Sequence, residues 1–234
     1  MNDIITAAQQ QGRELLNEVE AKTLMHEAGV PVVRTVLADS SEQAKEIAGE
    51  LGYPVALKVV SEDITHKSDA GGVMLDIADS DAVAVAYEAI LSNSLAAVPG
   101  AEIEGVAVQN MAPAGTEVIV GMTTDPQFGP VVMFGLGGVM VEVMKDVTFR
   151  VLPLTKRDVR QMVADIKGRV ILDGVRGAPP ADVEAIQDAL LKVADFVSAN
   201  PQVRELDLNP ILVNENGAVA VDARIVIAKS EATT

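Results

Sequence analysis

A nine-residue segment, Ile64–Gly72, gathers an imidazole, a lysine, two hydroxyls and two adjacent glycines. Glycines allow backbone N–H groups to come close to an anion, and Lys67 adds positive charge. The imidazole of His66 can act as a nucleophile, an acid or a base near neutral pH. Composition alone favours an ordinary polar loop. His66 is still the better of the two histidines, because His26 is expected to face solvent on a predicted helix.

A lysine interrupts the apolar run Val55–Val60, close before that segment. The run is too short for a helix and predicts a strand, in which a buried lysine is costly unless an anion meets it. Lys58 is therefore either a ligand for phosphate or an edge lysine whose ammonium group reaches water. The residue alone favours neither interpretation, whereas the neighbouring Ile64–Gly72 segment favours the phosphate ligand.

A second group of polar residues lies near the C-terminal end. The two-residue period of a strand places Glu205, Asp207 and Asn209 on one face, and Asp222 ends a following predicted strand. Oxygen ligands of this kind suit Mg²⁺ shared with nucleotide phosphates. The alternative is a charged strand face with a turn at Asn209-Pro210. We favour this alternative for Glu205, while the other three residues fit both interpretations equally.

A glycine-rich turn, Phe134–Val139, follows a predicted buried strand. It either approaches a phosphate or permits tight backbone packing. Its glycines do not follow the G-x-G-x-x-G order of dinucleotide-binding proteins, and the sequence has no Walker A motif. Nucleotide binding would therefore need another architecture. Four charged residues after the turn either touch phosphate and metal or lie at the surface: Glu142, Lys145, Asp146 and Arg150.

Alternating helices and strands are expected to position these groups in the first hundred residues. Apolar spacing predicts helices over 14–28, 44–51 and 83–90. Short apolar runs predict strands at 32–37, 54–60 and 73–77. Ser40 and Gln43 form a capping-box pattern before the second helix. The Pro-Gly-containing stretch 94–102 predicts a linker, and hence a lobe boundary near residue 100.

The remaining elements are expected to build a second lobe. Strands at 106–109, 117–121 and 131–134 are interpreted as one antiparallel sheet. Helices are predicted over 156–166, with Thr155 as the N-cap, and over 182–199. Short strands close the chain at 204–208, 211–213 and 218–222, and an Asn-Gly pair joins the last two as a hairpin.

Composition excludes several classes of function. The 234 residues carry 18 Lys and Arg against 34 Asp and Glu, a formal net charge of −16, which disfavours general affinity for nucleic acid or an anionic membrane. The absence of Cys excludes disulfides, thiolate metal sites and a Cys nucleophile. Residues 1–11 lack the features of a signal peptide, and no apolar run approaches a membrane span. We expect a soluble, cytoplasmic protein.

Five segments together carry a family resemblance: Glu20-Ala21-Lys22 with Gly29-Val30-Pro31, Tyr53–Val73, Val108–Pro130, Phe134–Asp146 and Glu205–Val213. In these segments the sequence resembles the ATP-grasp beta subunit of ADP-forming acyl-CoA synthetases (acetate–CoA ligase, ADP-forming). More distantly it resembles the succinyl-CoA synthetase beta subunit. The resemblance covers nearly the whole chain.

This resemblance implies an α/β (α+β) protein with the ATP-grasp fold, in which two α/β lobes clasp a nucleotide. Residues 1–103 would form the N-terminal lobe with the phosphate and histidine loop 61–72. Residues 104–234 would form the C-terminal lobe with the adenine hinge and the magnesium-binding strands. The implied reaction is acyl-CoA + ADP + phosphate ⇌ carboxylate + ATP + CoA, with ATP or ADP and Mg²⁺ as cofactors.

The resemblance also assigns roles to individual residues. His66 matches a phosphorylated histidine that passes the phosphoryl group between an alpha-subunit histidine and ADP, which suits imidazole chemistry. Residues assigned to the nucleotide are Lys58, Lys67, Gly71 and Gly72 at the phosphates, Gln109 and Met111 at adenine, and Glu117 at the ribose. Those assigned to Mg²⁺ are Asn209 and Asp222, with Asp207 as a weaker third.

A partner is implied as well, because the chain lacks any CoA-binding segment. In the family an alpha subunit binds CoA and makes the acyl phosphate, in an α2β2 assembly, so we expect this chain to be inactive alone in the full reaction. One alternative is an ATP-grasp carboxylate–amine ligase, which would not need His66. Another is a regulatory subunit without catalysis, against which the retained Lys58, His66, Asn209 and Asp222 argue.

Overall fold

The computed structural model describes residues 3–64, 66–138, 145–175, 177 and 179–229. Its contacts divide the chain into two compact units. The small unit comprises Asn17–Val19 and Val33–Met111, and the large unit comprises Met1–Leu16, Glu20–Val32 and Ala112–Thr234. This division falls after Met111, whereas the sequence predicts a boundary after residue 103. The difference arises because strand β5 (Gly105–Asn110) pairs with strands of the small unit.

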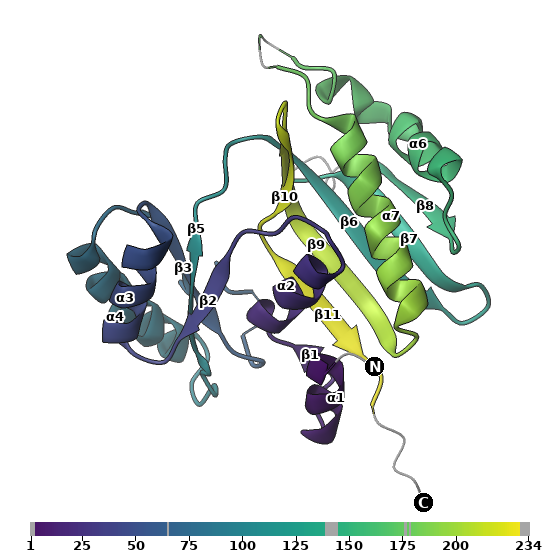
Figure 1. The fold of residues 1–234 in the computed structure, drawn as a ribbon. Coiled ribbons are helices and arrows are strands. Elements are labelled where there is room, and N and C mark those ends of the chain that lie inside the picture. The colour runs from purple at the N-terminus through teal and green to yellow at the C-terminus, as the bar shows by residue number, and fades with distance from the viewer. Residues whose placement is uncertain (1–2, 65, 139–144, 176, 178, 230–234) are drawn as a thin grey trace, which may run out of the picture. The chain divides into compact units, whose positions relative to one another are not determined.

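The small unit is a sheet with two helices packed against it. Its four strands among the described residues follow the order β2-β5-β3-β4, with every neighbouring pair antiparallel. Besides β5, they are β2 (Thr35–Ala38), β3 (Val55–Val60) and β4 (Val73–Ile77). Helices α3 (Ser41–Leu51) and α4 (Ser80–Ala97) contact each other and the sheet (Figure 1). The expectation that 106–109 belongs to the sheet of 117–121 is therefore wrong.

Local capping signals fix where these two helices begin. The Ser40 hydroxyl accepts a hydrogen bond from the Gln43 backbone N–H, which confirms the predicted start of α3. The Gln43 side chain in turn accepts from the backbone N–H of Asp39 at 2.7 Å. Asp79 caps α4 by accepting from the Ala82 N–H at 2.9 Å, and α4 continues to Ala97, inside the predicted linker.

The large unit is built on a wider antiparallel sheet. Seven strands of the described residues belong to it, in the order β1-β11-β9-β6-β7-β8, and β10 also pairs with β9. They are β1 (Leu15–Leu16), β6 (Thr116–Asp125), β7 (Gly129–Leu136), β8 (Val147–Val151), β9 (Val203–Asn214), β10 (Gly217–Ala220) and β11 (Ala223–Ile227). Figure 1 shows α6 (Lys156–Asp165) and α7 (Val183–Ala199) against one face of this sheet. Between them lies an apolar core that includes Phe134, Met162 and Leu190.

Helices α1 (Asp3–Gln10) and α2 (Glu18–Glu27) complete the N-terminal part, with a short 3₁₀ helix, η1 (Lys167–Ile171), after α6. Thr155 caps α6 in a reciprocal capping box with Asp158, as predicted for the N-cap. Among the helices of the described residues, none is long and apolar enough to cross a bilayer.

Several sequence expectations for the large unit need correction. The predicted helix over 14–28 begins only at Glu18, because Leu15 and Leu16 pair with β11 as strand β1. The two strands predicted at 204–208 and 211–213 are one continuous strand, β9. This strand runs through Pro210 and makes no turn there. Helix α1 and strands β8 and β11 were not predicted. The hairpin of β9 and β10 is confirmed, with Gly217 opposite Asn214.

Candidate functional site

Lys58 lies in the interior of the small unit's sheet. Strand β3 runs between β5 and β4, and Lys58 is paired with Ala107 on one side and Val73 on the other. The residue is only 5% exposed. The interpretation as an edge lysine reaching water is therefore wrong. Its ammonium group is met instead by a carboxylate: Nζ donates to Oε1 of Glu18 at 2.9 Å.

Glu18 joins Lys58 to the polar loop. Its other oxygen, Oε2, is ion-paired with Nζ of Lys67, so one carboxylate binds two lysines through separate oxygens. The Glu18 side chain is 2% exposed. Sequence reasoning did not identify Glu18, because it lies 40 residues before Lys58 and 49 before Lys67. Its position just before the Glu20-Ala21-Lys22 segment of the family resemblance was the one signal that could have drawn attention to it.

The loop that carries His66 is a compact set of turns. Backbone hydrogen bonds run from Ala70 N–H to the His66 carbonyl at 3.2 Å and from Gly72 N–H to the Lys67 carbonyl at 2.7 Å. His66 itself is exposed, and Lys67 next to it is held by Glu18. The imidazole thus belongs to an exposed residue next in sequence to Lys67, whose ammonium group meets Glu18 together with that of Lys58.

Close packing explains the two glycines at the end of this loop. Gly71 has φ +65°, and a Cβ there would lie 3.0 Å from Cβ of Asn93. A Cβ on Gly72 would lie 2.5 Å from Cγ1 of Val59, too close for any side chain. Both backbone N–H groups donate within the loop. Their role as phosphate ligands stays a prediction.

The predicted adenine-binding residues lie at the end of β5. Gln109 is 2% exposed and is paired with Thr35 and Ala56 on the neighbouring strands. Met111 is half-buried and is the last residue of the small unit. The structure places both residues in one short stretch of chain, and their contact with adenine stays a prediction.

Glu117 lies in the large unit, at the start of β6, where its side chain is exposed. The glycine-rich turn packs against it: Gly137 N–H donates to the Glu117 carbonyl at 2.7 Å, and a Cβ on Gly137 would lie 2.8 Å from Cβ of Glu117. On Gly138, with φ +63°, a Cβ would lie 3.0 Å from Oε2. Tight packing therefore accounts for these two glycines. Glu142 lies outside the described residues.

The predicted metal ligands also belong to the large unit. Leu206 and Leu208 are buried while Asn209 is exposed and Asp207 half-buried, which confirms the two faces predicted for this strand. Burial raises the pKa of Asp207; the Arg224 guanidinium lowers that pKa, and the Asp222 carboxylate raises it further.

The repulsion between these two carboxylates indicates that they are close, an arrangement that a divalent cation would stabilise. No cluster of three or more His, Cys, Asp or Glu in the described ranges could hold a metal. Two carboxylates and the Asn209 amide fit an ion that takes its remaining ligands from phosphate or water.

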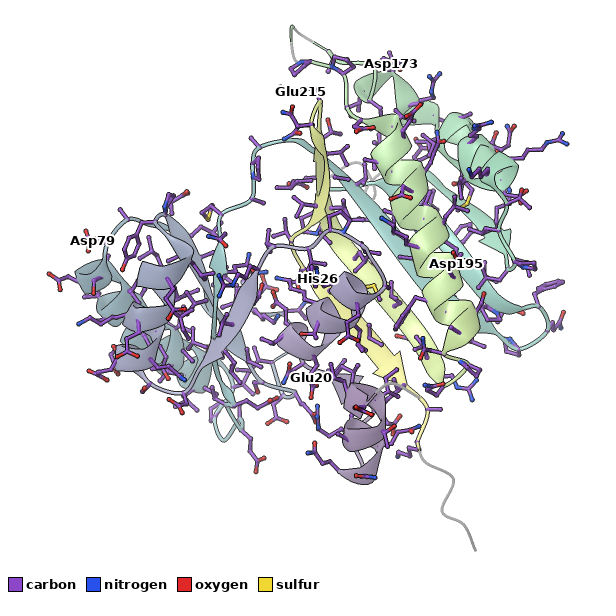
Figure 2. All side chains as sticks on the ribbon, viewed as in Figure 1. Glu20, His26, Asp79, Asp173, Asp195 and Glu215 are labelled. Carbon is purple, nitrogen blue, oxygen red and sulfur yellow. The ribbon has the colours of Figure 1, made fainter. Side chains whose placement is uncertain are left out.

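Other charged residues have structural partners. Glu205 pairs with Arg224 at 3.3 Å on the surface, as the charged-face interpretation predicts. Asp146 is buried and accepts hydrogen bonds from the backbone N–H groups that begin η1, those of Lys167 at 3.0 Å and Gly168 at 2.7 Å. Arg150 pairs with Asp165 at 2.8 Å. His26 is exposed on α2, as expected (Figure 2).

Known proteins of similar sequence match nearly the whole chain. The family model of the ATP-grasp domain matches residues 7–227. The beta subunit of acetate–CoA ligase [ADP-forming] I from Pyrococcus furiosus is 45% identical over 96% of this chain and 97% of its own length. Acetate–CoA ligase [ADP-forming] I from Archaeoglobus fulgidus is 48% identical over 90% of this chain, which spans 30% of that longer protein.

A solved relative is the dinucleotide forming acetyl-coenzyme A synthetase 1 of Candidatus Korarchaeum cryptofilum. In complex with coenzyme A and Ca-AMPCP, it matches with a TM-score of 0.94 and 45% identity over 96% of this chain and 98% of the matched chain. With coenzyme A and Mg-AMPPCP, it matches with a TM-score of 0.85 and 41% identity over the same shares, its phosphohistidine segment pointing towards the nucleotide-binding site.

These matches confirm both the ATP-grasp fold and the family resemblance that the sequence motifs indicate. They extend over nearly the whole chain, so they include the strand with Lys58, the loop with His66, strand β9 with Asp207 and the connection with Asp222, which lies after the end of β10 and not in the predicted strand 218–222. The chain belongs to the ATP-grasp family and, within it, to the beta subunits of ADP-forming acetate–CoA ligases.

Proposed function

We propose that this protein is the nucleotide-binding beta subunit of an ADP-forming acyl-CoA synthetase and transfers a phosphoryl group between a phosphohistidine and ADP or ATP. The observation that carries the proposal is that Lys58 and Lys67 converge on one carboxylate in the small unit, with the exposed His66 next in sequence to Lys67. Positive charge of this kind favours a phosphate next to the histidine.

His66 is the phosphoryl carrier in this proposal. A neutral imidazole nitrogen attacks phosphorus and forms a P–N bond as the incoming phosphoryl group leaves its donor. In the second step an oxygen of the ADP β-phosphate bonds to phosphorus, the P–N bond breaks, and its electron pair returns to the imidazole nitrogen. Lys58 and Lys67 bind phosphate oxygens and offset their negative charge.

The remaining contacts of the nucleotide are assigned by residue type. Gln109 and Met111 bind adenine, Glu117 accepts hydrogen bonds from the ribose hydroxyls, and Gly71 and Gly72 lie near the phosphates. Asn209 and Asp222, with Asp207 as a third, are the proposed Mg²⁺ ligands in the large unit. When bound, Mg²⁺ neutralises phosphate charge.

The full reaction requires an alpha partner that binds CoA and forms the acyl phosphate, in an α2β2 assembly. Support comes from the Archaeoglobus fulgidus relative, in which this chain corresponds to 30% of a longer polypeptide. A cytoplasmic location is part of the proposal and is supported by the absence of Cys from the sequence.

Phosphoryl transfer from labelled ATP tests the proposal. The chain is co-expressed with its alpha partner and incubated with γ-³²P-ATP and Mg²⁺, and label on this chain is tested for the acid lability and base stability of a phosphohistidine. Wild type is compared with His66→Ala and with His26→Ala, which removes the exposed histidine of α2 as a matched control.

We expect label on the wild type and on His26→Ala, and none on His66→Ala. If nucleotide binds but His66→Ala turns over normally, phosphoryl transfer through His66 is refuted, and the fold is better explained as that of a carboxylate–amine ligase. If Mg-ADP fails to bind even with the partner present, the fold is better explained as that of a regulatory subunit without catalysis.

A further inference from the structure

Glu18 is a buried carboxylate that the proposed phosphoryl transfer does not use. It is ion-paired with Lys58 and Lys67, the two residues assigned to phosphate. All three side chains belong to the small unit. Their exposed fractions are 2% for Glu18, 7% for Lys58 and 21% for Lys67. The carboxylate therefore occupies the ammonium groups that a nucleotide phosphate would need.

Glu18 binds both ammonium groups through charge-assisted hydrogen bonds, which are also the contacts that a phosphate would make with them. A phosphate has more oxygens and more negative charge than a carboxylate, so it competes with Glu18 for the lysines.

The two lysines differ in their freedom to move. Lys58 lies on the interior strand β3, with pairing on both sides. Lys67 lies in the turn next to His66 and is three times as exposed. Lys67 can therefore leave Glu18 by a change of side-chain rotamer, without the loss of any strand pairing.

We propose that Glu18 is a positioning residue that directs Lys58 and Lys67 toward one point while no nucleotide is bound, and that it competes with the incoming phosphate and releases Lys67 to it. This inference rests on the proposed function of the two lysines. Glu18 thus stabilises the ligand-free protein and lowers its affinity for phosphate. A residue with a purely structural role would not combine these two effects.

The test measures stability and affinity in the same variants. Glu18→Gln keeps the shape of the side chain and removes its charge. The matched control is Glu20→Gln on the same helix, α2, where the carboxylate pairs with Arg13 in the large unit (Figure 2). Melting temperature is measured without ligand, and dissociation constants for Mg-ADP and inorganic tripolyphosphate are measured by calorimetry, in both cases on the chain co-expressed with its alpha partner.

We expect Glu18→Gln to lower the melting temperature and to bind both ligands about tenfold more tightly, because one negative charge next to the phosphate is removed. Glu20→Gln should leave both dissociation constants unchanged. Glu18→Asp retains the charge and is one methylene shorter, so it cannot hold both lysines in the same geometry. Its affinity should lie between wild type and Glu18→Gln, which provides a second variant should the glutamine variant fail to fold.

Unchanged or weaker binding by these variants, with normal binding by the wild type, would overturn the role of Glu18 and leave the proposed function standing. Absence of binding of either ligand to the wild type would refute the phosphate assignment of Lys58 and Lys67, and this inference with it. The two failures are distinguishable because the second is already visible in the wild type.

Discussion

Replacement of Lys58 by methionine separates the two roles that the structure gives this residue. Methionine fills a similar volume inside the sheet but cannot pair with the buried Glu18 carboxylate. Of the two lysines, Lys58 and Lys67, only Lys67 then still pairs with Glu18. Removal of one partner from a buried ion pair costs about 3–5 kcal/mol. Because Lys67 still offsets part of the Glu18 charge, we expect a loss of folding free energy at the low end of this range, about 3 kcal/mol. For a chain of this size, that loss lowers the melting temperature by about 6–12 °C.

The assay is a double-mutant cycle that combines urea unfolding with Mg-ADP titration. The four proteins are wild type, Lys58→Met, Glu18→Gln and the double variant. The double variant no longer carries the buried Glu18 carboxylate, and its Lys67 is exposed enough to turn to water. It should therefore recover most of the lost stability. Nucleotide affinity should not recover, since the phosphate has lost Lys58 in both proteins that carry the methionine.

Two results would refute this reasoning. If the double variant is as unstable as Lys58→Met, the instability does not come from the Glu18 carboxylate that has lost Lys58. If Lys58→Met binds Mg-ADP as tightly as wild type, Lys58 is not a phosphate ligand and its buried charge has only a structural role.

Two further predictions concern single sites. Because the pKa of Asp207 is raised, its ionised form costs folding free energy as the pH rises above the ordinary Asp value of about 3.9. Without Mg²⁺, Asp207→Asn should therefore raise the melting temperature at about pH 7.5 and have no such effect at about pH 3.5; an equal gain at both would contradict the assignment. Gly72→Ala should cost about 1–3 kcal/mol in urea unfolding, because the new Cβ overlaps Val59, whereas Gly49→Ala in α3 meets no atom within 4 Å and should be neutral or stabilising.

Local signals in the sequence predicted much of the small unit. The run Val55–Val60 is strand β3, and Ser40 caps α3 as its pattern indicates. What the sequence could not provide was pairing between distant segments. Leu15 and Leu16 fit a helical period, but they pair with the edge of β11 and form a strand. The apolar run of β5 does not reveal which sheet it joins.

The candidate site shows the same limit. His66 and Lys67 are adjacent and Lys58 is near them in sequence, so composition and spacing single them out as one candidate group, whose chemistry stays a prediction. Glu18 was not, because its partners lie 40 and 49 residues away and only the folded chain brings them together. The role of Asp146 was equally hidden, since its hydrogen-bond partners are backbone N–H groups about twenty residues further along the chain.

The division of the chain into units has a consequence for protein engineering. Residues 33–111 interrupt the large unit as a domain insertion, and every strand pair of the large sheet forms without them. Val32, the last residue before the insertion, bridges to Ala220, which pairs with Ile211, which pairs with Val118. Three ladder steps span about 14 Å. Residues 112–117 and a short glycine-rich linker could therefore cover the span from Val32 to Val118 and replace the insertion, whereas a single cut after Met111 would separate β1 from the sheet that it completes.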